Sequence, residues 1–312
     1  MGFTPMTSAI PVENVYYLLC YAWNCLTERK FADVATAGAT DLADLLARVF
    51  ISGVNRLHRR GLERGYQERH EEVSVIRGRI EMFETASRFL DRHGRASCVF
   101  HELTIDTPQN RVVKAAMRTL AGVASLDRDN RAELRRLVRE VFEVTDLPLN
   151  RSLFRDVQLH ANNRHYTLLI HVAKLVLECV VPDERSGSYR FRDFTRERRE
   201  MARLFEAFVF NFLETERPDL NVRRDRLQWD ATSFSDPALD YLPTMLTDVS
   251  VRAPGRTVII DAKYYEQTLQ EYYDRKSIHS EHLYQLVSYL RNLEPAGGQD
   301  AVAEGLLIYP VT

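Results

Sequence analysis

The stretch 247–263 constrains the fold of this chain more than any other, because it combines two strand-like runs, a turn and three charged side chains. It reads TDVSVRAPGRTVIIDAK. The segment 253–256 supplies the turn, since Pro fixes φ and Gly tolerates a positive φ. β-branched residues on both sides favour strands, and the continuous apolar run 258–260 indicates a strand buried inside a sheet. We therefore predict a β-hairpin here.

Three charged side chains are predicted to meet at one end of this hairpin. Asp261 and Lys263 face the same side because side chains alternate along a strand, and Asp248 on the partner strand can join them. Two buried carboxylates are costly unless a cation lies between them, and hard oxygen ligands suit Mg²⁺. Such a metal can activate water for phosphodiester hydrolysis, with the lysine positioning that water or stabilising the transition state. The alternative is a solvent-facing strand with ordinary surface charges.

Length and composition argue against several other classes of protein. With 312 residues, one large domain or two of medium size are expected. No apolar run approaches the length of a membrane span, and no secretory signal opens the sequence. The 42 basic and 44 acidic residues nearly cancel, which argues against non-specific coating of nucleic acid. The four cysteines lack metal-binding spacing, so buried thiols in a reducing cytoplasm are the simpler interpretation.

The N-terminal part combines helical patterns with a β-rich region between about Tyr66 and Ile105. Thr107 and Pro108 have the composition of a helix N-terminus. The predicted helices cover residues 10–26, 40–60, 107 onward, 131–144 and 166–179.

A domain boundary is expected in the polar, breaker-rich segment 181–188. The C-terminal part then follows the order helix, three strands, helix, strand, and a crossover helix before the last strand favours parallel pairing. We therefore predict an α/β protein, with an N-terminal α+β domain at 1–185 and a mixed-sheet core at 186–312. The C-terminal elements are expected at 195–214, 222–229, around Asp248 and Asp261, at 280–293 and at 305–309.

Three further polar residues lie on the predicted C-terminal helices. Glu206 interrupts the apolar face of the first helix, and an acid there needs a partner or a metal. An ion pair with an arginine such as Arg203 is an equally simple interpretation. Gln285 and Tyr289 are four residues apart, so they share one face of the second helix.

The C-terminal third resembles the PD-(D/E)xK nuclease superfamily and its RecB-like branch, which carries a Gln-x-x-x-Tyr motif after the catalytic lysine. The residues 285–289, QLVSY, have that form. The resemblance implies a restriction-endonuclease-like core with Asp248 and Asp261 as ligands of Mg²⁺, for which Mn²⁺ can substitute. The Ala262 carbonyl oxygen is the candidate third ligand, and Lys263 is the catalytic lysine.

The same resemblance implies roles for the helical residues. Glu206 would be the acid on the first core helix, while Gln285 and Tyr289 would bind DNA or orient the site. The chain departs from the RecB-like branch in one respect, since it has no cysteine set for an iron–sulfur cluster.

The whole chain resembles the McrC family, the nuclease subunit of the McrBC modification-dependent restriction system. The residues that carry this resemblance lie at 10–23, 77–80, 102–111, 204–209 and 261–263. The resemblance implies an N-terminal part that docks on a hexameric AAA+ GTPase and stimulates its hydrolysis, while the partner recognises methylated DNA. No Gly-Lys dipeptide occurs, so no P-loop is present and we expect no nucleotide bound by this chain.

Two basic segments are candidates for contacts with that partner: residues 56–69 and the strand 77–79. A solvated basic face is an equally good interpretation of both.

The leading hypothesis is a Mg²⁺-dependent endonuclease that cuts double-stranded DNA in a 5-methylcytosine-dependent system, together with a GTPase partner. Two alternatives belong to other classes: a non-cutting adaptor that activates the AAA+ partner, and a stand-alone RecB-like repair exonuclease. The complete acidic set argues against the adaptor. The long N-terminal part, which matches no second catalytic domain, argues against the exonuclease.

Overall fold

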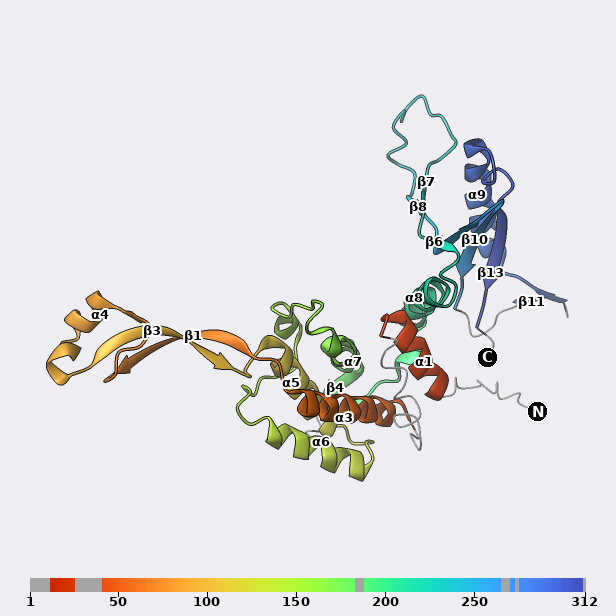
Figure 1. The fold of residues 1–312 in the computed structure, drawn as a ribbon. Coiled ribbons are helices and arrows are strands. Elements are labelled where there is room, and N and C mark those ends of the chain that lie inside the picture. The colour runs from red at the N-terminus through yellow and green to blue at the C-terminus, as the bar shows by residue number, and fades with distance from the viewer. Residues whose placement is uncertain (1–11, 26–40, 183–187, 265–269, 273–274, 311–312) are drawn as a thin grey trace. The chain divides into compact units, whose positions relative to one another are not determined.

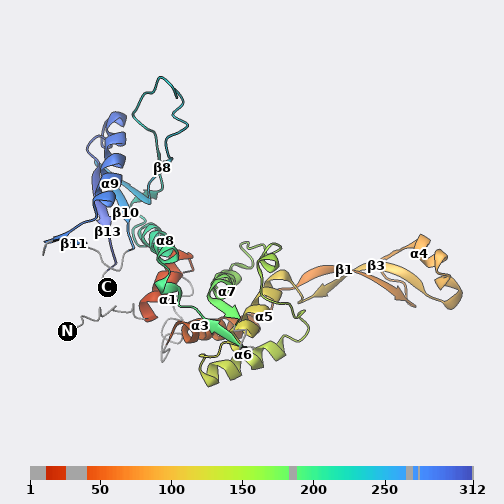
Figure 2. The same ribbon diagram turned by 180° about the vertical axis from the view of Figure 1, so that it is seen from behind.

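The computed structural model describes residues 12–25, 41–182, 188–264, 270–272 and 275–310 (Figures 1 and 2). The chain forms a mixed α/β structure with several small sheets, divided into two compact units. One unit, here called the helical unit, spans Ala43–Arg192. The other, here called the sheet unit, joins α1 (Val12–Ala22) to the residues from Asp193 onward. The expected division into 1–185 and 186–312 differs from this one in the place of α1.

Aromatic packing explains why α1 belongs to the sheet unit. Its partner there is α8 (Arg198–Glu216). The ring of Tyr21 lies 5.6 Å from that of Phe208 and 5.3 Å from that of Phe212, centroid to centroid. The Asn211 side-chain amide donates hydrogen bonds to the Tyr21 and Ala22 carbonyl oxygens at 2.8 and 3.1 Å. These contacts satisfy backbone acceptors at the end of α1, which its own helix cannot satisfy.

The helical unit consists of four longer helices and a three-stranded antiparallel sheet of order β1-β3-β2. Thr107 caps α5 by accepting a hydrogen bond from the Asn110 amide at 3.4 Å, as its position before Pro108 predicts. The helices are α3 (Leu42–Arg60), α5 (Pro108–Ala121), α6 (Arg128–Glu140) and α7 (Thr167–Cys179). The strands are β1 (Gly65–Val73), β2 (Arg79–Ile80) and β3 (Ala96–Thr104), with a short pair, β4 (Val180–Pro182) and β5 (Tyr189–Phe191).

The predicted helices and β-rich region of this part agree with the described elements to within a few residues. Position 40, where the second helix is predicted to begin, lies outside the described residues. The short helix α4 (Met82–Ser87) has no counterpart among the predictions, because six residues without a side-chain cap carry almost no helical signal.

The sheet unit is built on a four-stranded sheet of order β13-β10-β9-β6. The hairpin β9–β10 is antiparallel, and Gly255 in its turn has a φ of 76°. Strand β13 pairs with β10 in parallel after the crossover helix α9, so both the predicted hairpin and the predicted parallel pairing are confirmed. The elements are β6 (Asn221–Arg223), β9 (Val249–Ala253), β10 (Arg256–Ala262), α9 (Ser280–Leu293) and β13 (Glu304–Ile308). A separate hairpin is formed by β11 (Gln270–Tyr272) and β12 (Arg275–Ser277).

The single strand predicted at 222–229 is wrong, because the chain changes partner within it. Residues 221–223 pair with β9, whereas β7 (Arg226–Leu227) pairs with β8 (Met245–Leu246). Between them, the Asp225 amide donates to the Thr247 hydroxyl oxygen at 2.9 Å. This contact fixes the point at which the chain leaves one strand and enters the other.

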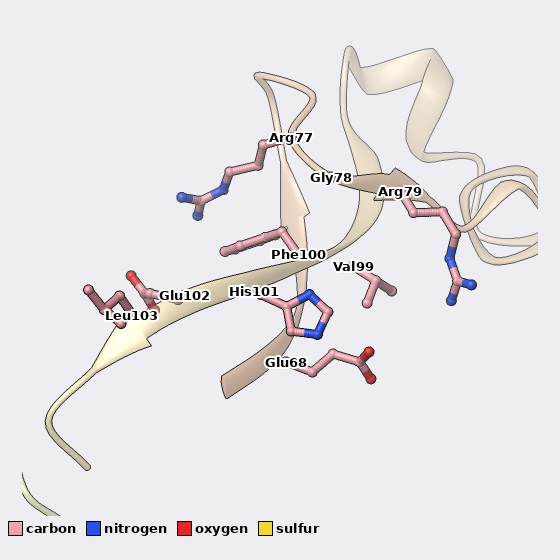
Figure 3. A pocket seen from close by; sticks show the side chains of 9 residues that line it. All are labelled: Glu68, Arg77, Gly78, Arg79, Val99, Phe100, His101, Glu102 and Leu103. Carbon is pink, nitrogen blue, oxygen red and sulfur yellow. The ribbon is translucent and has the colours of Figure 1, made fainter. Parts of the chain in front are cut away.

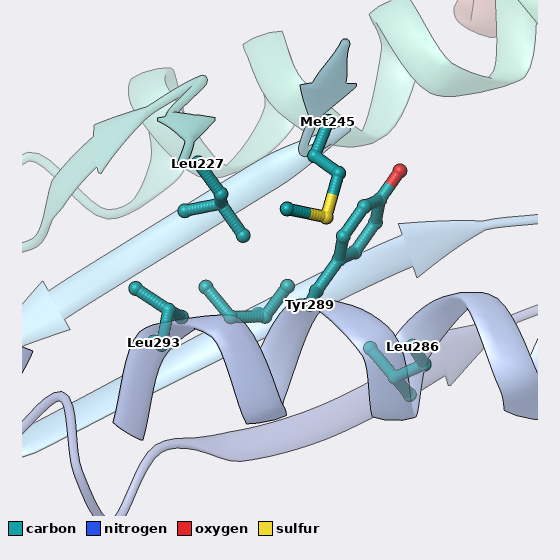
Figure 4. Packing of buried hydrophobic residues seen from close by; sticks show 6 residues of the cluster. Leu227, Met245, Leu286, Tyr289 and Leu293 are labelled. Carbon is teal, nitrogen blue, oxygen red and sulfur yellow. The ribbon is translucent and has the colours of Figure 1, made fainter. Parts of the chain in front are cut away.

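An apolar cluster fixes α9 on the hairpin (Figure 4). Ile259 from β10 is fully buried in it, together with Tyr289 and Leu286 from α9. Burial of each such side chain stabilises the fold by about 1.5–3 kcal/mol. The other members of the cluster are Leu227, Met245 and Leu293. The cluster therefore fixes the position of α9 along β10, the strand that carries Asp261.

Two predictions about composition can be compared with the structure. All four cysteines are buried, as expected for residues that pack as small apolar side chains. Within the described ranges, no helix is both long enough and apolar enough to cross a membrane.

Candidate active site

The register of the hairpin brings Asp248 and Asp261 together. Ile260 pairs with Val249, so the next residues outward, Asp261 and Asp248, are opposite each other at the open end of the hairpin. The Asp248 Oδ2 atom accepts a hydrogen bond from the Ala262 amide at 2.9 Å. Asp261 is fully buried. The two carboxylates therefore lie side by side on neighbouring strands, as the sequence pattern predicts.

Lys263 points to the same place, two residues beyond Asp261 and directly after the end of β10. Its Nζ atom lies 3.0 Å from Asp261 Oδ2 and donates a hydrogen bond to Gln285 Oε1 at 2.9 Å. Its backbone amide donates to the Ile308 carbonyl oxygen at 2.9 Å. The lysine is thus fixed through its main chain by β13 and through its side chain by α9.

Gln285 and Tyr289 continue this network along one face of α9. The Gln285 Nε2 atom donates to the Tyr289 hydroxyl at 2.8 Å, and that hydroxyl donates to the Leu246 carbonyl oxygen at 3.1 Å. The network therefore runs from Lys263 through α9 to a residue two positions before Asp248. Of the two roles expected for Gln285 and Tyr289, these contacts support the orientation of the site.

Burial dominates the electrostatics of the two aspartates. Burial raises the pKa of Asp261, the Glu206 carboxylate raises it further, and Lys263 opposes both effects. Burial and the charge of Asp261 raise the pKa of Asp248, against a lowering by the Ala262 amide. The Asp261 Oδ2 atom faces the Lys263 ammonium group at 3.0 Å, and within the described residues the carboxylate accepts no hydrogen bond from a main-chain amide or a hydroxyl group. A buried carboxylate in this condition is destabilised by its surroundings, and a cation would remove that cost.

Glu206 lies near the aspartates but outside their hydrogen-bonded network. It is half-buried on α8, and burial followed by the charge of Asp248 raises its pKa. The alternative ion pair with Arg203 is not formed, since the Arg203 guanidinium lies 3.2 Å from Glu200 instead. The structure therefore places Glu206 as a third carboxylate beside the pair.

The set of metal ligands expected here is small. Within the described part of the chain, no group of three or more His, Cys, Asp and Glu side chains is arranged to hold a metal ion. The expected ligands are two carboxylates, from Asp248 and Asp261, and the main-chain oxygen of Ala262. The fully buried Asp261 carboxylate, which lies beside Asp248 and faces the Lys263 ammonium group, fits a hard divalent cation such as Mg²⁺.

The structure adds a residue that the sequence reasoning missed. His282 is buried on α9, one turn before Gln285, and its Nδ1 atom lies 2.9 Å from the Tyr309 hydroxyl. Burial and the nearby charge of Lys263 lower its pKa. The signal was available, because His282 lies three residues before Gln285 and so shares its helical face.

The candidate partner-binding segment 77–79, of which only Arg79 belongs to a strand, lines a hollow of about 750 Å³ on the sheet of the helical unit (Figure 3). The Arg77 guanidinium carbon lies 3.8 Å from the centroid of the Phe100 ring, and Arg79 points away from that ring. Each arginine also bonds a glutamate, Arg77 with Glu71 at 3.1 Å and Arg79 with Glu81 at 2.8 Å. Both guanidinium groups stay accessible, which is compatible with a partner contact and with a solvated basic face.

Comparison with known proteins places these features in a family. A family profile described as "McrBC 5-methylcytosine restriction system component" matches residues 9–310. The chain is 38% identical over 301 residues to an Escherichia coli (strain K12) protein named "Type IV methyl-directed restriction enzyme EcoKMcrBC". That alignment covers 96% of this chain and 86% of the relative.

Two solved structures share the fold. One is the refined half-complex from the tetradecameric assembly of Thermococcus gammatolerans McrB AAA+ hexamers with bound McrC, with a TM-score of 0.58 at 22% identity. That match covers 97% of this chain and 64% of the solved chain. The other is the Thermococcus gammatolerans McrBC complex, with a TM-score of 0.50 at 22% identity, covering 66% and 58% respectively. This chain thus spans less than two thirds of either solved chain. Together with the profile and the E. coli relative, these matches confirm the resemblance to McrC: the chain belongs to the McrBC family of 5-methylcytosine restriction system components.

Proposed function

We propose that this chain is the DNA-cutting subunit of a modification-dependent restriction system, and that it hydrolyses phosphodiester bonds of double-stranded DNA with Mg²⁺. One observation carries the proposal. In a member of this family, a fully buried Asp261 lies beside Asp248 and 3.0 Å from the Lys263 ammonium group. The sheet unit then corresponds to a PD-(D/E)xK nuclease core, whose expected order of elements it follows.

Each residue of the site has a proposed role. Asp248, Asp261 and the Ala262 carbonyl oxygen would hold Mg²⁺, or Mn²⁺ in its place, and the bound metal would supply a nucleophilic water and charge for the phosphoryl oxygens. Lys263 directs its ammonium group at the same place, where it positions that water or stabilises negative charge as it develops. Its bond to Gln285 keeps the ammonium group oriented before DNA arrives.

The partner is proposed from the same relationship. The solved assemblies contain McrB AAA+ hexamers with bound McrC, and the E. coli relative is named a methyl-directed restriction enzyme. We infer that this chain docks on a hexameric AAA+ GTPase through its helical unit, residues 56–69 and 77–79 included, and stimulates GTP hydrolysis. The partner recognises 5-methylcytosine in DNA, and the pair acts in the cytoplasm.

Cleavage of methylated plasmid DNA by the complete complex tests the proposal. With GTP and Mg²⁺, Asp261→Ala and Lys263→Ala should each abolish cutting, while stimulation of the partner's GTPase survives. Asp240→Ala is the matched control, because this acid is exposed in the same unit and is expected to leave cutting unchanged. Cutting that persists in both site variants would remove this site from the reaction.

The two alternative functions give different results in simple assays. A non-cutting adaptor would show no heat of Mg²⁺ or Mn²⁺ binding in titration calorimetry and no cleavage in any mixture. A stand-alone exonuclease would degrade DNA ends without partner or GTP. The burial of Asp261 next to a second carboxylate, with Lys263 as the ammonium group beside them, favours the metal-dependent nuclease over the adaptor.

A further inference from the structure

Arg224 lies beside the acidic end of the hairpin, directly after β6 and before β7. Its neighbours on both sides are bonded to β9 and the residues before it. Arg223 pairs with Ser250 at the end of β6, and the Thr247 amide donates to the Asp225 carbonyl oxygen at 3.0 Å. The main chain of Arg224 is therefore held next to the segment that contains Asp248.

The side chain of Arg224 is positioned but not neutralised. Its guanidinium carbon lies 5.2 Å from the centroid of the Phe210 ring on α8, four residues beyond Glu206 and so on the same helical face. The residue is exposed, and it forms no ion pair or hydrogen bond with any residue whose placement the structure gives. Its charge nevertheless acts on both Glu206 and Asp248.

Arg252, on the neighbouring strand, shows what a structural arginine looks like in this unit. Its guanidinium bonds Asp225 and lies 3.2–3.4 Å from the Asp300 carboxylate oxygens. Its donors are thus used within the protein. Those of Arg224 remain available at the rim of the site.

We propose that Arg224 binds a phosphate of the DNA strand next to the phosphodiester that is cut. The inference rests on the proposed nuclease function. An approaching DNA backbone meets Asp248, Asp261 and Glu206, and like charges repel it. A guanidinium group offers paired donors that match phosphate oxygens, and stacking on Phe210 reduces the freedom lost on binding. Arg224 therefore offsets the repulsion at the place where the scissile strand must enter.

The test compares Arg224→Gln, Arg224→Lys and the control Arg226→Gln in the full complex with its GTPase partner. Arg226 is also exposed and carries the same charge two residues away, with only a 3.5 Å contact to the Thr244 hydroxyl. Cleavage kinetics are measured over a range of salt concentrations at saturating GTP. Arg224→Gln should lower kcat/KM about tenfold and reduce the slope of its logarithm against log salt by about 0.9, the value for one lost phosphate contact.

Arg224→Lys should restore the dependence of log kcat/KM on log salt but only part of kcat/KM itself. An ammonium group keeps the positive charge but lacks the paired donors of a guanidinium group. Unfolding temperature and GTPase stimulation should match those of the wild type in all three variants. Equal kinetics of Arg224→Gln and Arg226→Gln would overturn the inference, whether both are active or both impaired. If Asp261→Ala also cuts normally, the nuclease proposal itself fails; if Asp261→Ala is inactive, only the role of Arg224 fails.

Discussion

Asp106 of the helical unit and Asp261 of the sheet unit are both removed from solvent, yet their surroundings are opposite. Asp106 accepts hydrogen bonds from two guanidinium nitrogens of Arg111 at 2.8 Å, and from the amide and hydroxyl of Thr145 at 2.8 and 2.5 Å. Partial burial raises its pKa, but these bonds outweigh burial and hold the pKa well below its usual range. Asp261 is fully buried and faces the Lys263 ammonium group at 3.0 Å, but burial outweighs that contact and its pKa is raised.

Lys114, which is buried, and Lys263, which is partly buried, extend the comparison. Lys114 donates to the Val141 and Val144 carbonyl oxygens at 3.0 and 2.6 Å. Its ammonium group therefore links α5 to the residues that follow α6 within the helical unit. Lys263 instead faces Asp261 at 3.0 Å and Gln285 at 2.9 Å, beside a second carboxylate whose pKa is also raised. The hydrogen-bonded charges of the helical unit therefore indicate a structural role, whereas the neighbouring buried carboxylates of the sheet unit indicate a candidate functional site.

The largest effect on stability is expected from Lys114→Met, which keeps the length of the side chain and leaves two buried carbonyl oxygens without a donor. The free energy of unfolding should fall by about 3 kcal/mol, measured by urea denaturation followed by circular dichroism. Lys174→Met is the control, because Lys174 is exposed on α7 of the same unit. A loss no larger than that of the control would show that Lys114 is not a structural anchor.

A smaller effect, with a defined pH dependence, is expected from Asp106→Asn. Because folding lowers the pKa of Asp106, its contribution is present above the unfolded-state value of about 4 and is lost as the pH falls toward the folded-state value. Asp106→Asn should therefore destabilise the protein by about 2 kcal/mol at pH 7, and the difference from wild type should shrink in acid. A difference independent of pH would mean that the charge of Asp106 does not contribute.

The smallest effect has the opposite sign. In the metal-free protein at pH 7, Asp261→Asn should raise the free energy of unfolding by about 1 kcal/mol, since it removes a buried charge that folding disfavours. Added Mg²⁺ should raise the unfolding temperature of the wild type, by linkage to binding, and leave Asp261→Asn unchanged. Thermal unfolding in EDTA and in Mg²⁺ measures both. A less stable metal-free variant would instead identify the ion pair with Lys263 as structural.

The parts of the fold that could be predicted are those that short, local sequence patterns specify. Turn chemistry at 253–256, the apolar run before Asp261 and helical spacing over 280–293 each specify an element by themselves. The alternation of strand side chains then places Asp248, Asp261 and Lys263 on one side, so the core of the site follows from one stretch. The two motif residues of α9 share one helical face because they are four residues apart, and the Gln-x-x-x-Tyr resemblance assigns them to the same site.

The rest depends on contacts between distant segments, which spacing cannot specify. The packing of α1 on α8 joins Tyr21 to Phe208 and Phe212, far apart in the chain. The split of residues 222–229 depends on which strand each half finds as its partner. Arg224 becomes visible as a candidate only after that split is known, because its importance lies in its nearness to Asp248.

The docking of α1 on α8 also makes the Ala43–Arg192 unit an insertion within its neighbour. The polypeptide leaves the sheet-bearing unit after α1 and returns to it before α8, so two tethers connect the pieces. A protease nick in one tether would leave the fragments associated through the aromatic side chains of α1 and α8. A chimaera that takes the inserted unit from a relative would have to keep both of its chain connections to the sheet unit.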